Sequence, residues 1–389
     1  MSLQKSGLHP CFIHLNSDVQ RFSQKVENGV LHWYIPIPKQ KYKDDEKHDR
    51  LYLQNVVFFL RQYIKQTDHL VFHLNYSQCK HFTDELKVSF NCKIVLVVHY
   101  FAWCLDIMGN VSQLQNIIDK PDDELNPLGK QVNKSFNDEK NMLRSVDKVI
   151  SLSKHTTKLL QKVYDVKKQN ISTIYNGLGD KAKIHNDKEL IRMKYNLPIE
   201  VPVIMFVGRL DSGKGLSYFI QASKIVLEQY PNCHIIIAGS GDYQTCMKEC
   251  GNKWMNIHFT GWIEKTELYE LYEITDIGVI PSFSEQCNYV AIEMMMHGLS
   301  MITTLVSGLA EMTENGISSL QVPVIAQSDK VEIDSYLLAE KILYLLQHPE
   351  ERKRLGINAR KRYETVYSAE IFRQNMLQFY QSLFYPSAL

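Results

Sequence analysis

The chain has 389 residues, more than one hydrophobic core usually holds, so two domains are expected. Its apolar fraction of 44% and charged fraction of 22% are those of an ordinary soluble globular protein. The net charge of +1 lacks the strongly basic balance of a nucleic-acid-binding protein, so no nucleic-acid partner is expected. Eight scattered cysteines without a Cys-x-x-Cys pair predict buried, reduced thiols and no metal site.

The sequence contains neither a run of 18 apolar residues nor an N-terminal apolar stretch typical of a signal peptide. A cytoplasmic protein without a membrane-spanning helix is therefore expected. The first 180 residues carry 24 basic and 19 acidic side chains. This excess leaves two alternatives open: a peripheral contact with the inner face of a membrane, or ordinary scatter of surface charge.

In the first half, apolar runs bounded by turn residues predict six strands. These are expected at 10–16, 30–37, 69–75, 93–99, 147–152 and 170–175. Asn28-Gly29 is the expected turn between the first two strands, 39–50 a solvated loop and 51–66 an amphipathic helix. The polar stretch 103–141 is interpreted as an insertion or a helix pair. A helix capped near Ser153 is expected to end at Tyr164.

The second half again alternates strands and helices. Strands are expected at 201–207, 233–238, 256–260, 277–280, 299–304 and 320–324. Helices are expected at 188–195, 216–229, 264–272, 288–297, 331–347 and 350–384. This alternation is typical of parallel sheets covered by helices, so the sequence predicts two doubly wound α/β domains that face each other across a cleft.

Two glutamates mark the region around the strand at 277–280. Glu285 lies in the turn after this strand, and Glu293 follows in the next helix. Ligands of parallel sheets bind at the carboxyl ends of strands, so Glu285 is expected at the ligand edge. Two helical turns would let Glu293 face the same cleft. Taken alone, such a pair is more often part of a solvated helix face.

A glycine-rich loop follows the strand at 201–207. It reads Gly208-Arg209-Leu210-Asp211-Ser212-Gly213-Lys214-Gly215. Glycines let a backbone approach a ligand closely, and Arg209 and Lys214 bring two positive charges to a strand end. Fixed cations can stabilise the charge of a departing diphosphate, and the sequence has no Asp-x-Asp to hold a metal there. Surface cations beside a turn are the alternative.

Together, these segments resemble the family 4 retaining nucleotide-sugar glycosyltransferases. Glu285 and Glu293 match the family's E-x7-E signature, and the loop 208–215 matches its G-R-L-x-x-x-K-G. Shorter matches are Ser145 to Ser153, Ile174 to Gly177, and Phe259 to Gly261. The resemblance implies a GT-B fold with an acceptor-side Rossmann-like domain at 1–185 and a donor domain at 186–367. A C-terminal helix at 368–389 would cross back to the first domain.

The resemblance also implies roles for individual residues. Arg209 and Lys214 would bind the donor diphosphate, Glu293 the ribose hydroxyls, and Glu285 the donor sugar near the reacting carbon. His99 would contact the sugar or the acceptor, unless it only ends a strand. Further donor contacts would come from Gly208 of the phosphate loop, from the backbone amides of Gln286, Cys287, Asn288 and Tyr289, and from Gly239 to Asp242, Gly261 and Trp262 around the base.

The implied activity is transfer of a sugar from a nucleoside diphosphate-sugar to an acceptor hydroxyl, with retention of configuration. A UDP-sugar is the favoured donor, and neither a metal nor a cofactor is expected. The acceptor would be a glycan, a lipid-linked molecule or a peptide. An accessory subunit of a glycosyltransferase complex and a GT-B nucleotide-sugar epimerase stay open as alternatives.

The sequence departs from the family at several motif positions. Gln286-Cys287-Asn288 replaces Gly-Phe-Gly, which predicts a more filled sugar pocket, and Ser307-Gly308 replaces Gly-Gly. Gly179 stands where the family has Asp. Residues 3–15 resemble the end of the family's first helix and its second strand, so the first βα unit is expected to be missing. This last departure favours the accessory-subunit alternative.

Overall fold

The computed structural model describes residues 7–37, 45–65, 69–75, 80–182, 188–327 and 330–384. The chain forms two compact units. Unit 1 comprises Met1–Leu96, Lys140–Lys148 and Leu377–Leu389, and unit 2 comprises Val97–Glu139 and Val149–Met376. The division passes through two strands, β5 (Cys92–Val98) and β6 (Lys148–Ser151). The predicted domain boundaries at 185 and 367 stay predictions.

Unit 1 begins with a small sheet whose strands lie in the order β1-β3-β2. These strands are β1 (Cys11–Ser17), β2 (Ser23–Glu27) and β3 (Val30–Pro36). β1 and β3 are parallel, whereas β2 and β3 form an antiparallel hairpin. Asn28 and Gly29 form its turn, with φ of 50° and 78°. The predicted turn at Asn28-Gly29 is therefore confirmed, but it joins β3 to β2, a strand that was not predicted. β2 was missed because it is polar and mostly exposed.

Unit 1 also contains two helices and two strands of a second sheet. These are α1 (Asp45–Tyr63), β4 (Leu70–Leu74), α2 (Lys80–Ser89) and the first part of β5. Since α1 begins at Asp45, the predicted loop is wrong from that residue on, and its part at 39–44 lies outside the described residues. α2 was not predicted. The end of α15 (Ala369–Phe384) also belongs to unit 1, where the Tyr380 hydroxyl lies 2.7 Å from Nδ1 of His73 on β4.

Unit 2 starts with the segment after β5, which is helical. Its elements are α3 (Trp103–Asp106), α4 (Val111–Ile118), η2 (Asp122–Glu124) and most of α5 (Pro127–Ser145). The alternative of a helix pair is therefore the better interpretation of 103–141. After β6 come α6 (Lys154–Lys162), η3 (Lys168–Asn170) and β7 (Ile171–Thr173). β6 and β7 belong to a sheet with the strand order β4-β5-β6-β7.

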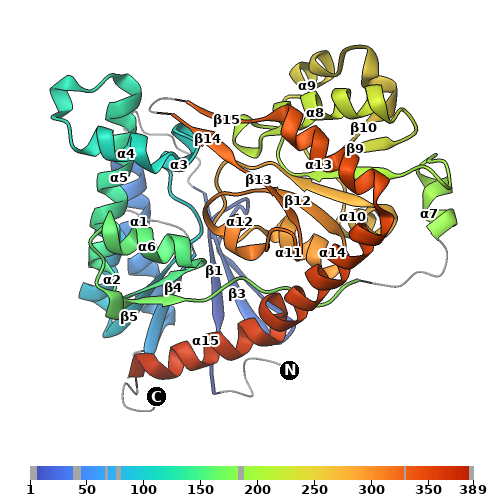
Figure 1. The fold of residues 1–389 in the computed structure, drawn as a ribbon. Coiled ribbons are helices and arrows are strands. Elements are labelled where there is room, and N and C mark those ends of the chain that lie inside the picture. Colours follow the sequence, from blue (N-terminus) through green and yellow to red (C-terminus); the bar gives the residue numbers. More distant parts are fainter. Residues whose placement is uncertain are drawn as a thin grey trace. The chain divides into compact units, whose positions relative to one another are not determined.

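The main sheet of unit 2 is parallel throughout the described residues, with the strand order β10-β9-β8-β11-β12-β13 (Figure 1). The strands are β8 (Val203–Val207), β9 (His234–Ala238), β10 (Ile257–Gly261), β11 (Ile277–Ile280), β12 (Ser300–Thr304) and β13 (Leu320–Val322). This is the 3-2-1-4-5-6 order of a doubly wound fold, and the strand order reverses between β8 and β11.

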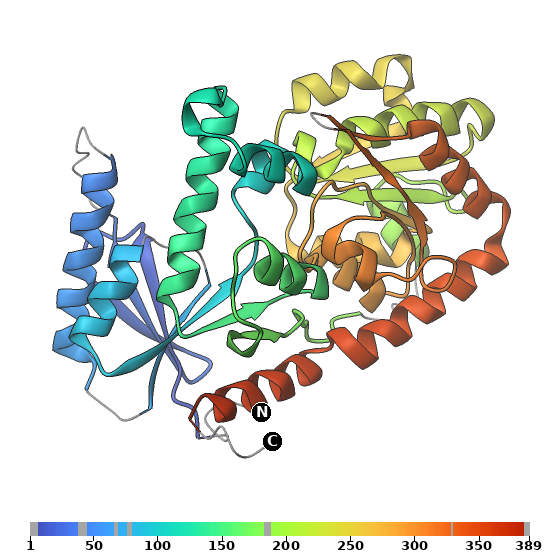
Figure 2. The ribbon, with the colours of Figure 1, turned by 60° about the vertical axis from the view of Figure 1, so that its left-hand side comes forward.

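Helices cover this sheet (Figure 2). They are α7 (Lys188–Lys194), η4 (Ser212–Lys214), α8 (Leu216–Gln229), α9 (Tyr243–Cys250), η5 (Gly251–Asn256), α10 (Lys265–Ile274), α11 (Tyr289–Met296), α12 (Ser307–Met312), α13 (Ser335–Gln347) and α14 (Pro349–Arg362). Neither α9 nor α12 was predicted. The expected helix at 331–347 begins only at Ser335, because residues 331–333 form β15 (Val331–Ile333), which pairs with β14 (Val324–Ala326).

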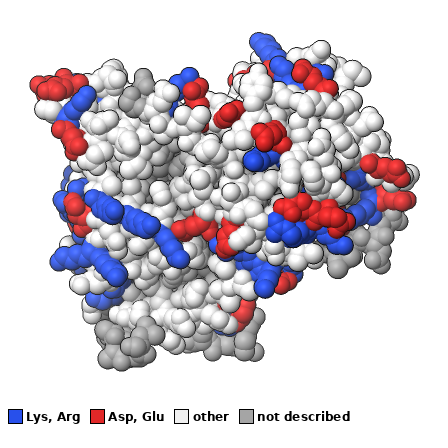
Figure 3. All heavy atoms as spheres, in the orientation of Figure 1, with Lys and Arg blue, Asp and Glu red and all other residues white. Residues whose placement is uncertain are grey.

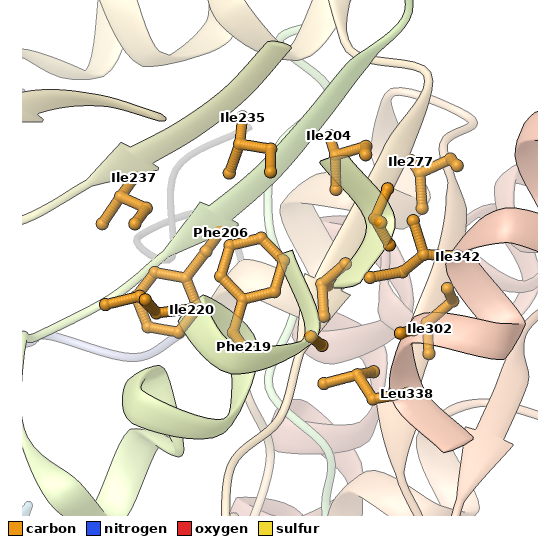
Figure 4. Packing of buried hydrophobic residues seen from close by; sticks show 14 of the residues in the cluster. Ile204, Phe206, Phe219, Ile220, Ile235, Ile237, Ile277, Ile302, Leu338 and Ile342 are labelled. Atoms are coloured by element: carbon orange, nitrogen blue, oxygen red, sulfur yellow. The ribbon is translucent and has the colours of Figure 1, made fainter. Parts of the chain in front are cut away.

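The core of unit 2 lies between the sheet and α8 and α13 (Figure 4). Phe219 and Ile220 of α8 pack on Phe206 and on neighbouring isoleucines of the strands, and Leu338 and Ile342 of α13 extend the same layer. Because parallel strands are buried on both faces, they appear in the sequence as continuous apolar runs. This holds for β8, β9, β11 and β12, which are buried almost throughout, whereas the edge strands β10 and β13 are only partly buried.

The C-terminal helical region is interrupted. The π-helical turn η6 (Tyr363–Tyr367) follows α14, and Ser368 separates it from α15, so the helical region expected at 350–384 consists of two α-helices joined by this turn. Positive and negative side chains are interspersed on the face shown in Figure 3. None of the described helices combines the length and apolar character needed to span a membrane.

Candidate active site

The site lies at the switch point of the parallel sheet of unit 2, where the strand order reverses between β8 and β11. The loop after β8 (208–215, the phosphate loop) and the loop after β11 both leave the carboxyl edge of the sheet. The N–H of Phe283 donates to the Gly213 carbonyl at 3.0 Å and joins the two loops. Open α/β sheets bind their ligands at this place.

The glycines of the site let backbone segments approach one another. Gly215 has φ of 67°, and a Cβ there would overlap the Pro281 carbonyl oxygen. A Cβ on Gly239 would overlap the Gly208 carbonyl. The N–H of Gly239 donates to the Gly261 carbonyl at 3.0 Å, so the predicted donor glycines 208, 239 and 261 lie on adjacent strand ends. Close packing of backbone on backbone therefore requires glycine at positions 215 and 239, whether or not a ligand binds there.

Lys214 and Glu285 form an ion pair across the switch point. Lys214 Nζ lies 2.5 Å from Glu285 Oε1, with side-chain exposures of 23% and 11%. Asp211 caps the short helix η4, because its carboxylate accepts the Lys214 N–H at 3.1 Å. The same carboxylate binds Arg209 Nε at 2.6 Å, and the Arg209 side chain is 65% exposed. Of the predicted site residues, Lys214 and Glu285 are therefore in contact at this edge, and Arg209 lies in the same loop, paired with Asp211.

The backbone of Glu285 is fixed by α12. Its N–H donates to Ser307 Oγ at 2.8 Å, while its carbonyl accepts the Ser307 hydroxyl at 2.7 Å and the Gly308 N–H at 2.7 Å. A Cβ at Gly308 would overlap the Gln286 carbonyl. The motif position Ser307-Gly308 thus supports the turn that carries Glu285.

Residues 286–289 lead from this turn into α11. Gln286 and Cys287 are buried, and burial raises the pKa of the Cys287 thiol to about 12. Asn288 is the N-cap of α11, where its side chain accepts the Ala291 N–H at 2.8 Å. Its own N–H points to Met312 Sδ at 3.2 Å. Tyr289 is 46% exposed. The predicted contacts of these amides with a donor stay predictions.

Glu293 has partners that differ from those of Glu285. It is 2% exposed and lies within α11, where one carboxylate oxygen binds Lys265 Nζ and the other accepts the Tyr272 hydroxyl at 3.1 Å. Burial, followed by the charge of Glu293, raises the pKa of Tyr272 well above its usual value. Glu285 lies in the turn before α11, as predicted, so the chain between the two glutamates is only partly helical. Glu285 contacts the phosphate loop, whereas Glu293 contacts α10.

His99 directly follows β5, as predicted, and burial lowers its pKa. The segment after it is held by a buried polar network. Glu139 accepts the Ala102 N–H at 2.6 Å and the Tyr164 hydroxyl at 2.5 Å, and Trp103 Nε1 donates to the Tyr164 oxygen at 2.9 Å. Burial raises the pKa of Glu139 to about 7, although these hydrogen bonds lower it in part. Sequence reasoning missed this network.

Two further predicted positions follow the ends of neighbouring strands, Asp242 after β9 and Trp262 after β10. Asp242 caps α9 by accepting the Thr245 N–H at 3.1 Å, and the Trp262 side chain is 70% exposed. Within the ranges that the structure describes, no three His, Cys, Asp or Glu side chains cluster in a way that could hold a metal ion.

Residues 187–362 match the family model of glycosyl transferases group 1. An uncharacterized glycosyltransferase of Methanocaldococcus jannaschii is 29% identical over 181 residues, which are 45% of this chain and 46% of that protein. The chain spans about half the length of the curated relatives that it first matches.

Solved structures resemble the chain over nearly its whole length. Sucrose-phosphate synthase from Thermosynechococcus elongatus has a TM-score of 0.75 and 22% identity, over 99% of this chain and 91% of that one. HepE of Anabaena in complex with UDP has a TM-score of 0.64 and 15% identity, over 85% and 82%. The predicted α/β class and family resemblance are confirmed: residues 187–362 match the model of the group 1 glycosyl transferases, and the chain has the GT-B fold.

Proposed function

We propose that the chain is a retaining glycosyltransferase that moves a sugar from a nucleoside diphosphate-sugar to an acceptor hydroxyl in glycan synthesis. The observation that carries this proposal is the ion pair of Lys214 and Glu285 at the switch point of the sheet, with Arg209 in the same loop as Lys214. The names of the relatives support glycosyl transfer. HepE, with the same fold, was crystallised with UDP and with UDP-glucose, which supports a UDP-sugar as the donor.

In the proposed reaction, the bond between the anomeric carbon and the diphosphate oxygen breaks, and this oxygen keeps the electron pair. Lys214 and the exposed guanidinium of Arg209 would bind the diphosphate and stabilise its growing negative charge. The acceptor hydroxyl would attack the same face of the sugar and pass its proton to the departing phosphate. Glu285 would orient the sugar, and Glu293 would bind the ribose hydroxyls in place of its contact with Lys265.

The first experiment is thermal unfolding of the purified chain with UDP, GDP, ADP or CDP, with and without Mg²⁺. A ligand that binds only the folded protein stabilises it by about 2.7 kcal/mol at 100 times its Kd, which raises Tm by several degrees. We expect such a rise with UDP, without Mg²⁺, and its loss in Arg209→Ala.

Lys353→Ala is the matched control, since Lys353 is an exposed cation on α14. It should keep the full rise in Tm. If no nucleotide raises Tm in the wild type, the proposal is contradicted and the accessory-subunit alternative is favoured. A rise that requires Mg²⁺ would contradict the role of the two fixed cations.

A further inference from the structure

The turn that carries Glu285 is contacted by three segments that each follow a different strand of the β5-β6-β7 series. We call residues 284–288 the Glu285 loop. Gly109, after β5, lies so close that a Cβ there would be 2.8 Å from the Ser284 Cβ. Thr156, after β6, donates to the side-chain oxygen of Gln286. Asn176, after β7, donates to the Cys287 carbonyl at 3.2 Å. The segments before β8 thus hold three residues of this loop.

Thr156 is the best defined of these contacts. It is fully buried in the first turn of α6, where its N–H donates to Ser153 Oγ at 3.0 Å and its hydroxyl lies 2.7 Å from the same oxygen. Its second partner, Gln286, is 6% exposed. A buried amide oxygen that loses its donor costs free energy, so this contact favours one conformation of Gln286.

Gln286 is the direct neighbour of Glu285. On one side, α12 holds the Glu285 backbone through Ser307 and Gly308. On the other side, Thr156 holds the adjacent side chain. The phosphate loop does not depend on this second support. It is held by Asp211 and by the hydrogen bond from the Phe283 N–H to the Gly213 carbonyl.

We propose that Thr156 is a positioning residue for the donor sugar: through Gln286, it holds the Glu285 loop so that the Glu285 carboxylate keeps its place beside Lys214. This inference rests on the proposed function and adds a residue from α6 to the donor site. Because Thr156 acts on the sugar-facing carboxylate and not on the phosphate loop, its loss should weaken binding of the sugar and leave binding of the nucleotide nearly unchanged.

The test compares Thr156→Val, which removes the hydroxyl at nearly constant volume, with Thr156→Ser, which keeps it. For each full-length variant, Kd is measured by calorimetry for UDP and for UDP-glucose, UDP-galactose and UDP-N-acetylglucosamine. The ratio to be compared is the Kd of UDP divided by the Kd of the UDP-sugar that the wild type binds most tightly. In Thr156→Val we expect this ratio to fall about fivefold to tenfold. The Kd of UDP should stay within about twofold, and Thr156→Ser should restore the ratio.

Thr157→Val is the matched control. The Thr157 hydroxyl is also hydrogen-bonded, to Ser151 Oγ at 2.9 Å, to the Ser153 carbonyl at 3.1 Å and to Thr173 Oγ1 at 2.7 Å, but none of these partners belongs to the Glu285 loop. It should keep the wild-type ratio. An unchanged ratio in Thr156→Val, an equal loss for UDP and UDP-sugar, or no rescue by serine would overturn the inference alone. A wild type that binds neither UDP nor any UDP-sugar would instead overturn the proposed function, and this inference with it.

Discussion

Lys214→Ala is expected to lower the turnover of the donor by about 10²–10³-fold, the usual loss when one fixed group that stabilises developing negative charge is removed. Lys214 Nζ is 2.5 Å from Glu285 and only partly exposed, so water would replace it poorly. Glu285→Ala should cause a loss of similar size, because it removes the carboxylate that we propose faces the sugar. The measurement is the initial rate of UDP release from the UDP-sugar that the wild type binds best.

The two substitutions should not be additive, because each one breaks the same ion pair. We expect the double variant to be little slower than the slower single variant. Each single variant also leaves a partly buried charge without its partner, so thermal unfolding must first establish that the variants are folded at the assay temperature. Lys353→Ala again serves as the control for removal of a positive charge. Wild-type turnover in both single variants would contradict the proposed site.

The donor half of the fold was predictable because its parallel strands are buried on both faces. β11 and α8 begin and end where the apolar pattern predicted. The motifs around Lys214 and Glu285 follow these strands directly, so their meeting at one sheet edge also followed from the pattern. Local periodicity could not reveal β2, which is polar and exposed, or α2, which is a short mixed helix.

The contacts around the site depended on residues distant in sequence. Thr156 and Gln286 are 130 positions apart, and Lys265 reaches Glu293 from a different helix. Neither pair forms a motif, so only the folded chain shows that Gln286 is tied to α6 and that Glu293 has a lysine partner. The E-x7-E spacing predicted separate roles for the two glutamates but not their partners, and in the structure each carboxylate pairs with a different lysine.

Glu139 is the group for which the structure predicts the clearest dependence of stability on pH. It is 8% exposed, and burial raises its pKa from 4.5 to about 7. The folded state therefore favours the protonated carboxyl. Its contribution is fully present below pH 4.5 and is lost as the pH rises through 7, because the native state must then bury a carboxylate. A shift of this size corresponds to about 3 kcal/mol.

Glu139→Gln should remove this dependence, because glutamine keeps an oxygen that accepts the Ala102 N–H and has an amide N–H that can donate to the Tyr164 oxygen, but it does not ionise. We expect its free energy of unfolding, relative to the wild type, to increase by about 2–3 kcal/mol between pH 5 and pH 8. Urea unfolding at pH 5, 6, 7 and 8 measures this difference, since the other titrating groups are common to both proteins. Glu350→Gln, at an exposed glutamate of α14, should show no such trend. A difference for Glu139→Gln that stays constant across this range would mean that Glu139 is already ionised in the folded protein at pH 5, and that the segment after His99 is held by a buried carboxylate.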